Sequence, residues 1–260
     1  MANKDIKIVK VEISAEDRLK KALNKIKKEC IRVMPSSAGF ETSQAIDTRF
    51  GGSAYAEKGE KAPICEHCGK PLTFIFQYRG KYDKDLKPSG DLYSVYYCFD
   101  CVPIGRAEEE KGQWAIVTHK NPDVSKFVEQ KENISSIFTP TSCSLSRVFV
   151  LPDYETIENN YSEIAELCEE IDSDDPMSAY EDAGNSIGCQ MEPSTTLGGY
   201  PIWIQGESEH TCPECEGKVE LAVQIDSEEA VNLMFGDAGC LYVFKCPKHK
   251  NGFAIEMQCF

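Results

Sequence analysis

Two pairs of closely spaced cysteines, each followed further along the chain by a second pair of metal-ligand residues, are the most chemically informative feature of the sequence. Within every pair the two residues lie three positions apart, the spacing at which one turn presents two ligand atoms to the same ion. Thiolate and imidazole are the ligands that zinc prefers. The pattern predicts two zinc sites, formed by Cys65, Cys68, Cys98 and Cys101, and by Cys212, Cys215, Cys246 and His249.

For each site to form, the fold must bring its two ligand pairs together. The first pair, Cys65 and Cys68, precedes a segment in which apolar residues alternate from Leu72 to Tyr78, and the segment Leu92 to Tyr97 leads into the second pair. Alternation of this kind predicts β-strands. Because an antiparallel strand pair places the start of one strand beside the end of the other, both ligand pairs should meet at one end, as in a zinc ribbon.

The completeness of the ligand sets bears on the role of the metal. Four protein ligands fill the tetrahedral shell of zinc and leave no position for a reacting water, so both ions are predicted to be structural and no catalytic residue is assigned. A thioredoxin-like redox pair is the rival interpretation, but it needs a CxxC at the start of a helix, and here the pairs precede strands. Cys240 and His210 are the alternatives to His249 as the fourth ligand of the second site, and neither has a counterpart in the first.

The segments that carry the two sites resemble each other over a longer stretch. The glycine pair after Phe50 aligns with the glycine pair after Leu197, and reading on without gaps superposes the CxxC pairs and then Gln77 on Gln224. Self-similarity in one register predicts an internal duplication. The expected fold class is therefore α+β: a duplicated antiparallel β-rich unit, each copy with a zinc-ribbon-like metal site, together with flanking helices.

The flanking helices are expected on both sides of the first repeat. Apolar residues recur at helical spacing from Leu19 to Val33 and from Ile157 to Ile171, and Asp182 to Thr196 is interpreted as a loop. The predicted organisation has four parts that pack as one compact body. They are an N-terminal helical segment (1–47), a first repeat with a zinc site (48–119), an acidic helical connector (120–194) and a second repeat with a zinc site (195–260).

The charge of the chain is strongly negative and unevenly distributed. The net charge is −15, and between Arg147 and Lys218 there are many Asp and Glu residues but no Lys or Arg. Proteins that bind nucleic acids neutralise phosphates with Lys and Arg, so a nucleic-acid partner is not expected. A basic protein would be attracted by such a surface. Solubility alone is the other explanation of the acidic residues, and it stays open.

The sequence also bears on the compartment. No apolar stretch is long enough to cross a membrane, and the residues after Met1 lack the apolar core of a signal peptide. We therefore expect a cytoplasmic protein without membrane contact, whose 13 cysteines stay reduced or bind metal. The oligomeric state is not determined by these features.

Two families share motifs with this chain. The stretches Thr48 to Tyr55 and Leu72 to Gln77 resemble the first half of the YwqG-like proteins, a bacterial family of unknown function, and Leu197 to Gln205 resembles the start of their second half. The segment Gly198 to Ile225 is similar to programmed cell death protein 2 and its yeast relatives, which are dedicated chaperones for a ribosomal protein. The resemblance implies a duplicated α+β fold rich in antiparallel strands and supplies no catalytic residues.

These observations favour a non-enzymatic zinc-binding module for protein interaction, such as a chaperone or adaptor for a basic client protein. An immunity protein of a toxin system is one alternative. An enzyme is another, and it would need a polar cleft between the repeats, lined by residues such as Gln77, Gln224 and Asp237.

Overall fold

The protein is described by a computed structural model that covers residues 13–39, 41–101, 112–129 and 138–260. The chain divides into two compact units. We call the part formed by residues 1–28 and 149–191 the helical unit, and the part formed by residues 29–148 and 192–260 the sheet unit. The combination of helices with mostly antiparallel strands confirms the predicted α+β class.

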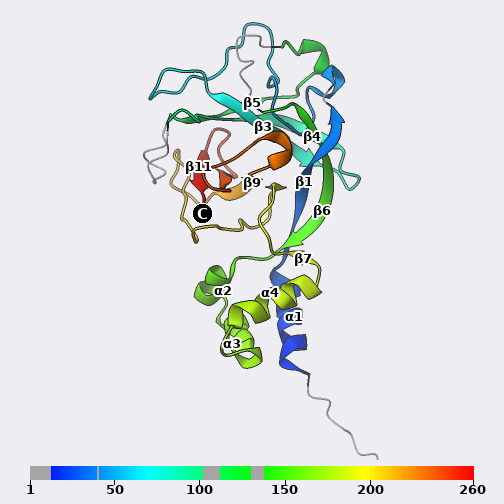
Figure 1. Ribbon diagram of the computed structural model, residues 1–260, viewed down its shortest axis with the longest axis vertical. Helices are drawn as coiled ribbons and strands as arrows, with labels where there is room; N and C mark the ends of the chain where they lie inside the picture. Colours follow the sequence, from blue (N-terminus) through cyan, green and yellow to red (C-terminus); the bar gives the residue numbers. More distant parts are fainter. Residues whose placement is uncertain (1–12, 40, 102–111, 130–137) are drawn as a thin grey trace, which may run out of the picture. The chain divides into compact units, whose positions relative to one another are not determined.

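The strands of the sheet unit lie in the order β11-β10-β9-β8-β1-β6-β2-β3-β4-β5 (Figure 1). Their bounds are β1 Lys28–Gly39, β2 Arg49–Phe50, β3 Thr73–Tyr82, β4 Pro88–Tyr97, β5 Trp114–His119, β6 Thr141–Val150, β8 Thr196–Leu197, β9 Glu220–Asp226, β10 Cys240–Lys245 and β11 Phe253–Gln258. Single turns of 3₁₀-helix span Thr42–Gln44, Val124–Lys126 and Glu229–Val231.

Two groups of four strands, on either side of β1 and β6, share the same pairing. Arg49 of β2 lies opposite Gln77 of β3, and Thr196 of β8 lies opposite Gln224 of β9. In each group an antiparallel hairpin follows, β3–β4 or β9–β10, and a last antiparallel strand, β5 or β11, completes it. The similarity between the two sequence segments therefore extends to strand order and to register.

Side chains from both groups form one hydrophobic core within the sheet unit. The rings of Phe99 and Phe235 stack with centroids 5.9 Å apart, and Tyr93 meets Phe253 edge-on at 6.0 Å. Each of these pairs joins one group to the other. Because aromatic side chains bury a large apolar area, each group depends on the other to cover its inner face.

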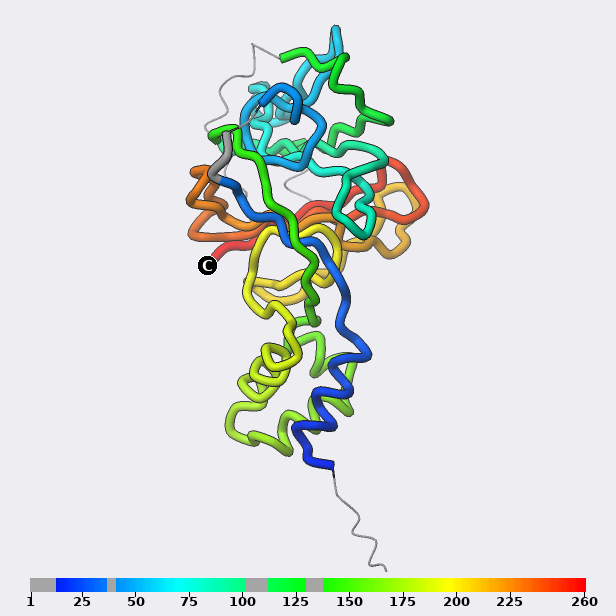
Figure 2. The backbone as a smooth tube through the Cα atoms, turned by 90° about the vertical axis from the view of Figure 1, so that its right-hand side faces the viewer, coloured from blue at the N-terminus to red at the C-terminus, as the bar shows by residue number. Residues whose placement is uncertain are grey.

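The helical unit contains α1 Ala15–Ile26, α2 Tyr154–Asn160, α3 Ser162–Ile171 and α4 Pro176–Ser186, and the short strand β7 Cys189–Gln190 pairs in parallel with Phe149 and Val150. Figure 2 shows α1 (blue) running beside the helices formed by residues 149–191. Leu19 and Leu23 of α1 are fully buried in a cluster with apolar residues of α2, α3 and α4. None of the helices in the described part of the chain has the length and apolar character that crossing a bilayer requires.

Two segments that were expected to be helical contain strands. Helix α1 ends at Ile26, so Cys30 and Val33 lie on β1 and do not continue its apolar face. Pairing in the sheet accounts for the change: Ile31 lies opposite Leu197 of β8, and β-branched residues such as Ile31 and Val33 favour an extended strand. The connector 120–194 likewise includes β6, whose alternating polar and apolar residues fit an extended strand in the sheet.

The loop predicted to begin at Asp182 begins later in the structure, because α4 continues to Ser186. Gly184 accounts for the weak helical signal at this point. It allows close packing of the helix, since an added Cβ would lie 2.7 Å from the sulfur of Met191. A helix built on small residues has little of the apolar periodicity from which helices are recognised.

Glu228 is a half-buried carboxyl group of the sheet unit. Burial and the nearby Asp226 raise its pKa to about 7, and the positive charge of Arg32 opposes the shift only in part. A carboxyl whose pKa is higher in the folded than in the unfolded protein stabilises the fold at low pH, and this contribution is lost as the pH rises towards 7.

We therefore expect Glu228→Gln to raise the free energy of unfolding at pH 8 by about 1 to 3 kcal/mol and to have a much smaller effect at pH 5. Denaturant titrations of both proteins at the two pH values would measure the difference. Glu229→Gln is the matched control, because its carboxyl is exposed and adjacent. An equal gain for Glu228→Gln at both pH values would contradict the explanation.

Candidate metal centres

The first ligand pair of each centre lies in a tight turn. The N–H of Cys65 donates to the carbonyl of Lys70 at 2.8 Å, and the N–H of Gly69 donates back to the carbonyl of Cys65 at 2.9 Å. The same two bonds form around Cys212 in the second centre. The residue that closes each turn has left-handed backbone, Gly69 with φ 71° and Glu216 with φ 55°. This conformation is what turns the chain sharply enough to aim both sulfurs at one point.

The second ligand pair of each centre follows the return strand of a hairpin. Strand β4 leads directly into Cys98, and strand β10 leads directly into Cys246. The N–H of Cys98 donates to the carbonyl of Gln113 at 2.8 Å, and that of Cys246 donates to the carbonyl of Gly252 at 2.7 Å. In each centre, backbone hydrogen bonds therefore hold both ligand pairs at the same end of the hairpin.

In the first centre the four sulfurs approach one another closely. The Sγ atoms of Cys65 and Cys101 are 3.7 Å apart, as are those of Cys68 and Cys98. A tetrahedral ion with metal–sulfur bonds of about 2.3 Å places its sulfurs about 3.8 Å apart, so the cage has the size that zinc requires. The sulfurs are too distant for disulfides, whose bond length is about 2.0 Å, and all 13 cysteines of the chain are unbridged.

The second centre has the same size with one nitrogen ligand. The Nδ1 atom of His249 lies 3.5 Å from the sulfur of Cys212 and 3.4 Å from that of Cys246, and the sulfurs of Cys215 and Cys246 are 4.0 Å apart. In each centre the four ligand atoms all lie within 4.8 Å of one another. The structure thus brings the eight residues singled out in the sequence into two groups that are spatially suited to bind a metal.

The electrostatics of the clusters also fit a cation. Desolvation and the three neighbouring sulfurs raise the pKa of Cys101 to about 12. Burial alone would raise the pKa of Cys65 as well, but hydrogen bonds from the backbone N–H groups of His67 and Cys68 and from the side chains of Cys68 and Cys98 together outweigh it and lower that pKa to about 7. Sulfurs this close repel each other when all are ionised, and a divalent cation at the centre would remove that repulsion.

The two alternatives to His249 lie outside the second cluster. The sulfur of Cys240 is 3.1 Å from a carboxylate oxygen of Asp226, and the Nε2 atom of His210 is 2.5 Å from a carboxylate oxygen of Glu256. Each already has a hydrogen-bonding partner of its own. The partly buried pair of His210 and Glu256 was not foreseen, because 46 positions separate the two residues and neither lies in a motif.

The glutamines considered for a cleft between the repeats have a different environment. Gln77 is fully buried, and its side chain accepts from the N–H of Tyr55 and donates to the carbonyls of Ala45 and Asp47. Gln224 is equally buried and makes equivalent bonds to loop backbone. These amides fasten loops to the sheet, so they do not line an open cleft.

A substitution at Gly252 tests the geometry of the second centre. A Cβ at this position would lie 2.6 Å from the sulfur of Cys212 and 3.0 Å from the Cβ of His249. We expect Gly252→Ala to weaken metal binding at the second centre at least tenfold and to leave the first unchanged, measured by competition with a chelator of known affinity. Gly217→Ala is the control, because its Cβ would meet only the Cys215 sulfur, at 3.3 Å. Unaltered affinity in Gly252→Ala would show that the cluster is not the binding site.

The chain was compared with models of known protein families. A family model described as "Domain of unknown function (DUF1963)" matches residues 48–249, a range that contains both clusters completely. No curated protein matches the chain.

Proposed function

The chain belongs to the DUF1963 family, whose description assigns no activity, and from its structure we propose that it is a non-catalytic protein-interaction module stabilised by two zinc ions. Its partner is a basic client protein, for which it acts as a chaperone or adaptor. The observation that carries the proposal of a basic client is the composition of the second segment of the helical unit. From 149 to 191, the segment that contains α2, α3 and α4, there are many carboxylates and no Lys or Arg.

The proposal of zinc rests on ligand chemistry and cage size. Three or four thiolates with at most one imidazole are typical of structural zinc, and the distances between the ligand atoms agree with tetrahedral coordination. Each set offers four protein ligands, so no open position is left for a substrate. Zinc held in this way acts as a cross-link between the two ends of a hairpin. A reducing compartment such as the cytosol suits the unbridged cysteines.

We also propose that the two groups of strands arose by duplication of one segment. Two observations support this proposal. The strand pairs have the same register, with Arg49 opposite Gln77 and Thr196 opposite Gln224, and the same turn occurs around Cys65 and around Cys212. The motif resemblances from the sequence, in both halves to YwqG-like proteins and from Gly198 to Ile225 to programmed cell death protein 2, would be in keeping with this origin and with a chaperone role.

We propose that the surface that binds the client is formed by exposed carboxylates of α3. Glu163, Glu166 and Glu169 are exposed, and in the described part of the chain none of them forms an ion pair. Unpaired carboxylates on one helix attract a basic partner over distances near the Debye length, about 8 Å at physiological salt. Binding of this kind should weaken as salt is added.

Affinity capture with matched variants tests the function. The zinc-loaded full chain is immobilised, and proteins retained from a lysate of the source cells are identified by mass spectrometry. One variant carries glutamine at Glu163, Glu166 and Glu169, and a control of the same net charge carries glutamine at three exposed positions of the sheet unit: Glu129, Glu220 and Glu229.

The proposal expects one dominant basic protein to be retained by the wild type and by the control, and to be lost from the α3 variant. Retention of that protein should fall as salt rises from 0.05 to about 0.5 M. Failure to retain any specific protein, or equal retention by the α3 variant and the control, would refute the assignment of the client surface.

A further inference from the structure

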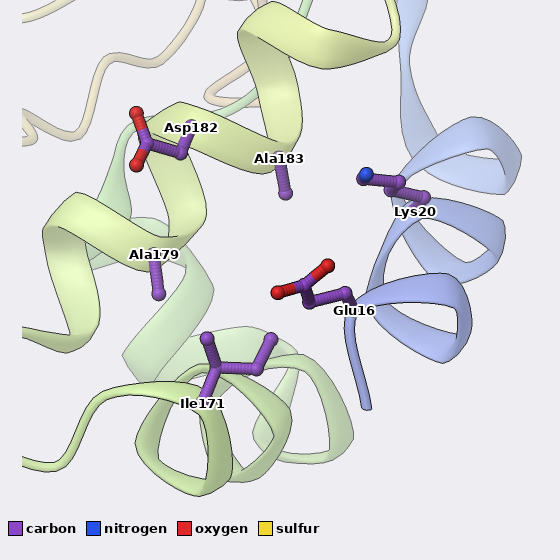
Figure 3. Close-up of a pocket in the computed structure, with 6 residues that line it drawn as sticks. All are labelled: Glu16, Lys20, Ile171, Ala179, Asp182 and Ala183. Carbon is purple, nitrogen blue, oxygen red and sulfur yellow. The ribbon is translucent and has the colours of Figure 1, made fainter. Parts of the chain in front are cut away.

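A small cavity lies among three helices of the helical unit (Figure 3). Its volume is about 190 Å³, and six residues line it: Glu16, Lys20, Ile171, Ala179, Asp182 and Ala183. The cavity exists because α4 presents two alanines, whose methyl groups are too short to fill the space towards α1. Its lining is therefore apolar on the α3 and α4 side and carries charged groups on the α1 side and at Asp182.

The two carboxylates at this cavity belong to exposed residues, and the Lys20 ammonium shares the lining with them. Neither Glu16 nor Asp182 forms an ion pair with any residue that the structure describes. On another face of α1, two residues from both Glu16 and Lys20, the guanidinium of Arg18 lies 2.6 Å from both carboxylate oxygens of Glu170 on α3. This contact shows that a guanidinium pairs with a carboxylate between two helices of the same unit, outside the cavity.

We propose that the cavity receives one arginine side chain of the basic client. Its aliphatic part lies against Ile171, Ala179 and Ala183, and its guanidinium lies between Glu16 and Asp182. Arginine fits better than lysine, because its planar fork can reach two carboxylates and is more weakly hydrated. The identity of the partner rests on the proposed function, which takes the client to be basic. The Lys20 ammonium in the wall opposes a second cation, so a single arginine should bind with a dissociation constant of about 1 mM.

Methyl NMR on the intact, zinc-loaded chain tests the site directly. The probe is the capped peptide Gly-Gly-Arg-Gly-Gly, titrated into protein labelled at the methyl groups of alanine and isoleucine. Saturable shifts are expected at Ile171, Ala179 and Ala183. The same peptide with citrulline, which keeps the shape and removes the charge, should bind at least tenfold more weakly, and the lysine peptide should fall between the two.

Two variants test the two halves of the site separately. Ala183→Leu fills the cavity, and the pair Glu16→Gln with Asp182→Asn removes the charge without changing shape. Each should reduce affinity for the arginine peptide at least tenfold. Glu181→Gln is the control for Asp182, because it removes an exposed carboxylate of α4 that does not line the cavity. If Ala183→Leu fails to fold, the variant with Glu16→Gln and Asp182→Asn tests the arginine site alone.

The outcomes separate this inference from the proposed function. If a basic client is captured but its affinity is unchanged in both cavity variants, the cavity is not its arginine site and the function stands. If the arginine peptide binds in the cavity but no client is captured, the site stands and the function fails. Equal shifts with the citrulline peptide, or equal binding of spermidine, would overturn the assignment of the cavity to arginine.

Discussion

Replacing Cys65 and Cys68 by serine should lower the zinc content from two ions per chain to one and unfold much of the sheet unit. Structural zinc contributes on the order of 10 kcal/mol in small domains, which approaches the whole stability of an ordinary protein. The loss should be large because one ligand pair precedes the first strand of a hairpin and the other follows its second strand, and Cys65 and Cys101 are 36 positions apart. Elemental analysis and calorimetry would measure both effects.

The same experiment has two internal comparisons. Replacing Cys212 and Cys215 should also remove one ion, and all four substitutions together should remove both. Cys259→Ser is the matched control, because this cysteine belongs to neither cluster, and it should leave the zinc content at two. Purified wild-type protein with far fewer than two zinc ions per chain would refute the assignment of both centres.

The second large effect is expected at the buried glutamines. Gln77→Met keeps the size of the side chain but leaves the N–H of Tyr55 and the carbonyls of Ala45 and Asp47 without their partner. Each buried backbone group that loses its bond costs about 1 to 3 kcal/mol. We expect a loss of about 3 to 5 kcal/mol in the free energy of unfolding, at the upper end for single substitutions. Chemical denaturation would measure it.

Gln224→Met should have a similar cost, because this side chain bonds to the backbone of Ser194 and Ile202 in the same way. The two losses should add, since the residues belong to different strand groups and share no partner. Gln205→Met is the control, because its side chain is exposed and makes one bond to a backbone carbonyl. A cost below about 1 kcal/mol in both buried variants would show that the loops are held by other contacts.

The parts of the structure that could be predicted from the sequence are those encoded over short distances. The CxxC spacing identified the ligand pairs, and the alternation from Leu72 to Tyr78 identified the hairpin strand that follows the first of them. The pairs then had to meet because an antiparallel hairpin returns to its start. Both clusters in the structure consist of the residues singled out in this way.

The parts that could not be predicted depend on contacts between distant segments. Strands β1 and β6 lie in the middle of the sheet, where their neighbouring strands come from distant parts of the chain, and Pro35 interrupts the first of them. The cavity of the helical unit depends on where Ala179 and Ala183 face α1, which no local pattern encodes. Residues such as Glu228 acquire their shifted pKa only when burial and Asp226 act together in the fold.

The position of the first metal centre along the chain has a consequence for synthesis on the ribosome. All four of its ligands are translated before any residue of the second strand group, so a nascent chain can close this centre early. At that moment the rings of Tyr93 and Phe99 still lack Phe253 and Phe235, which cover them in the finished core. A product terminated between the two strand groups would therefore hold its metal, expose an aromatic surface and aggregate.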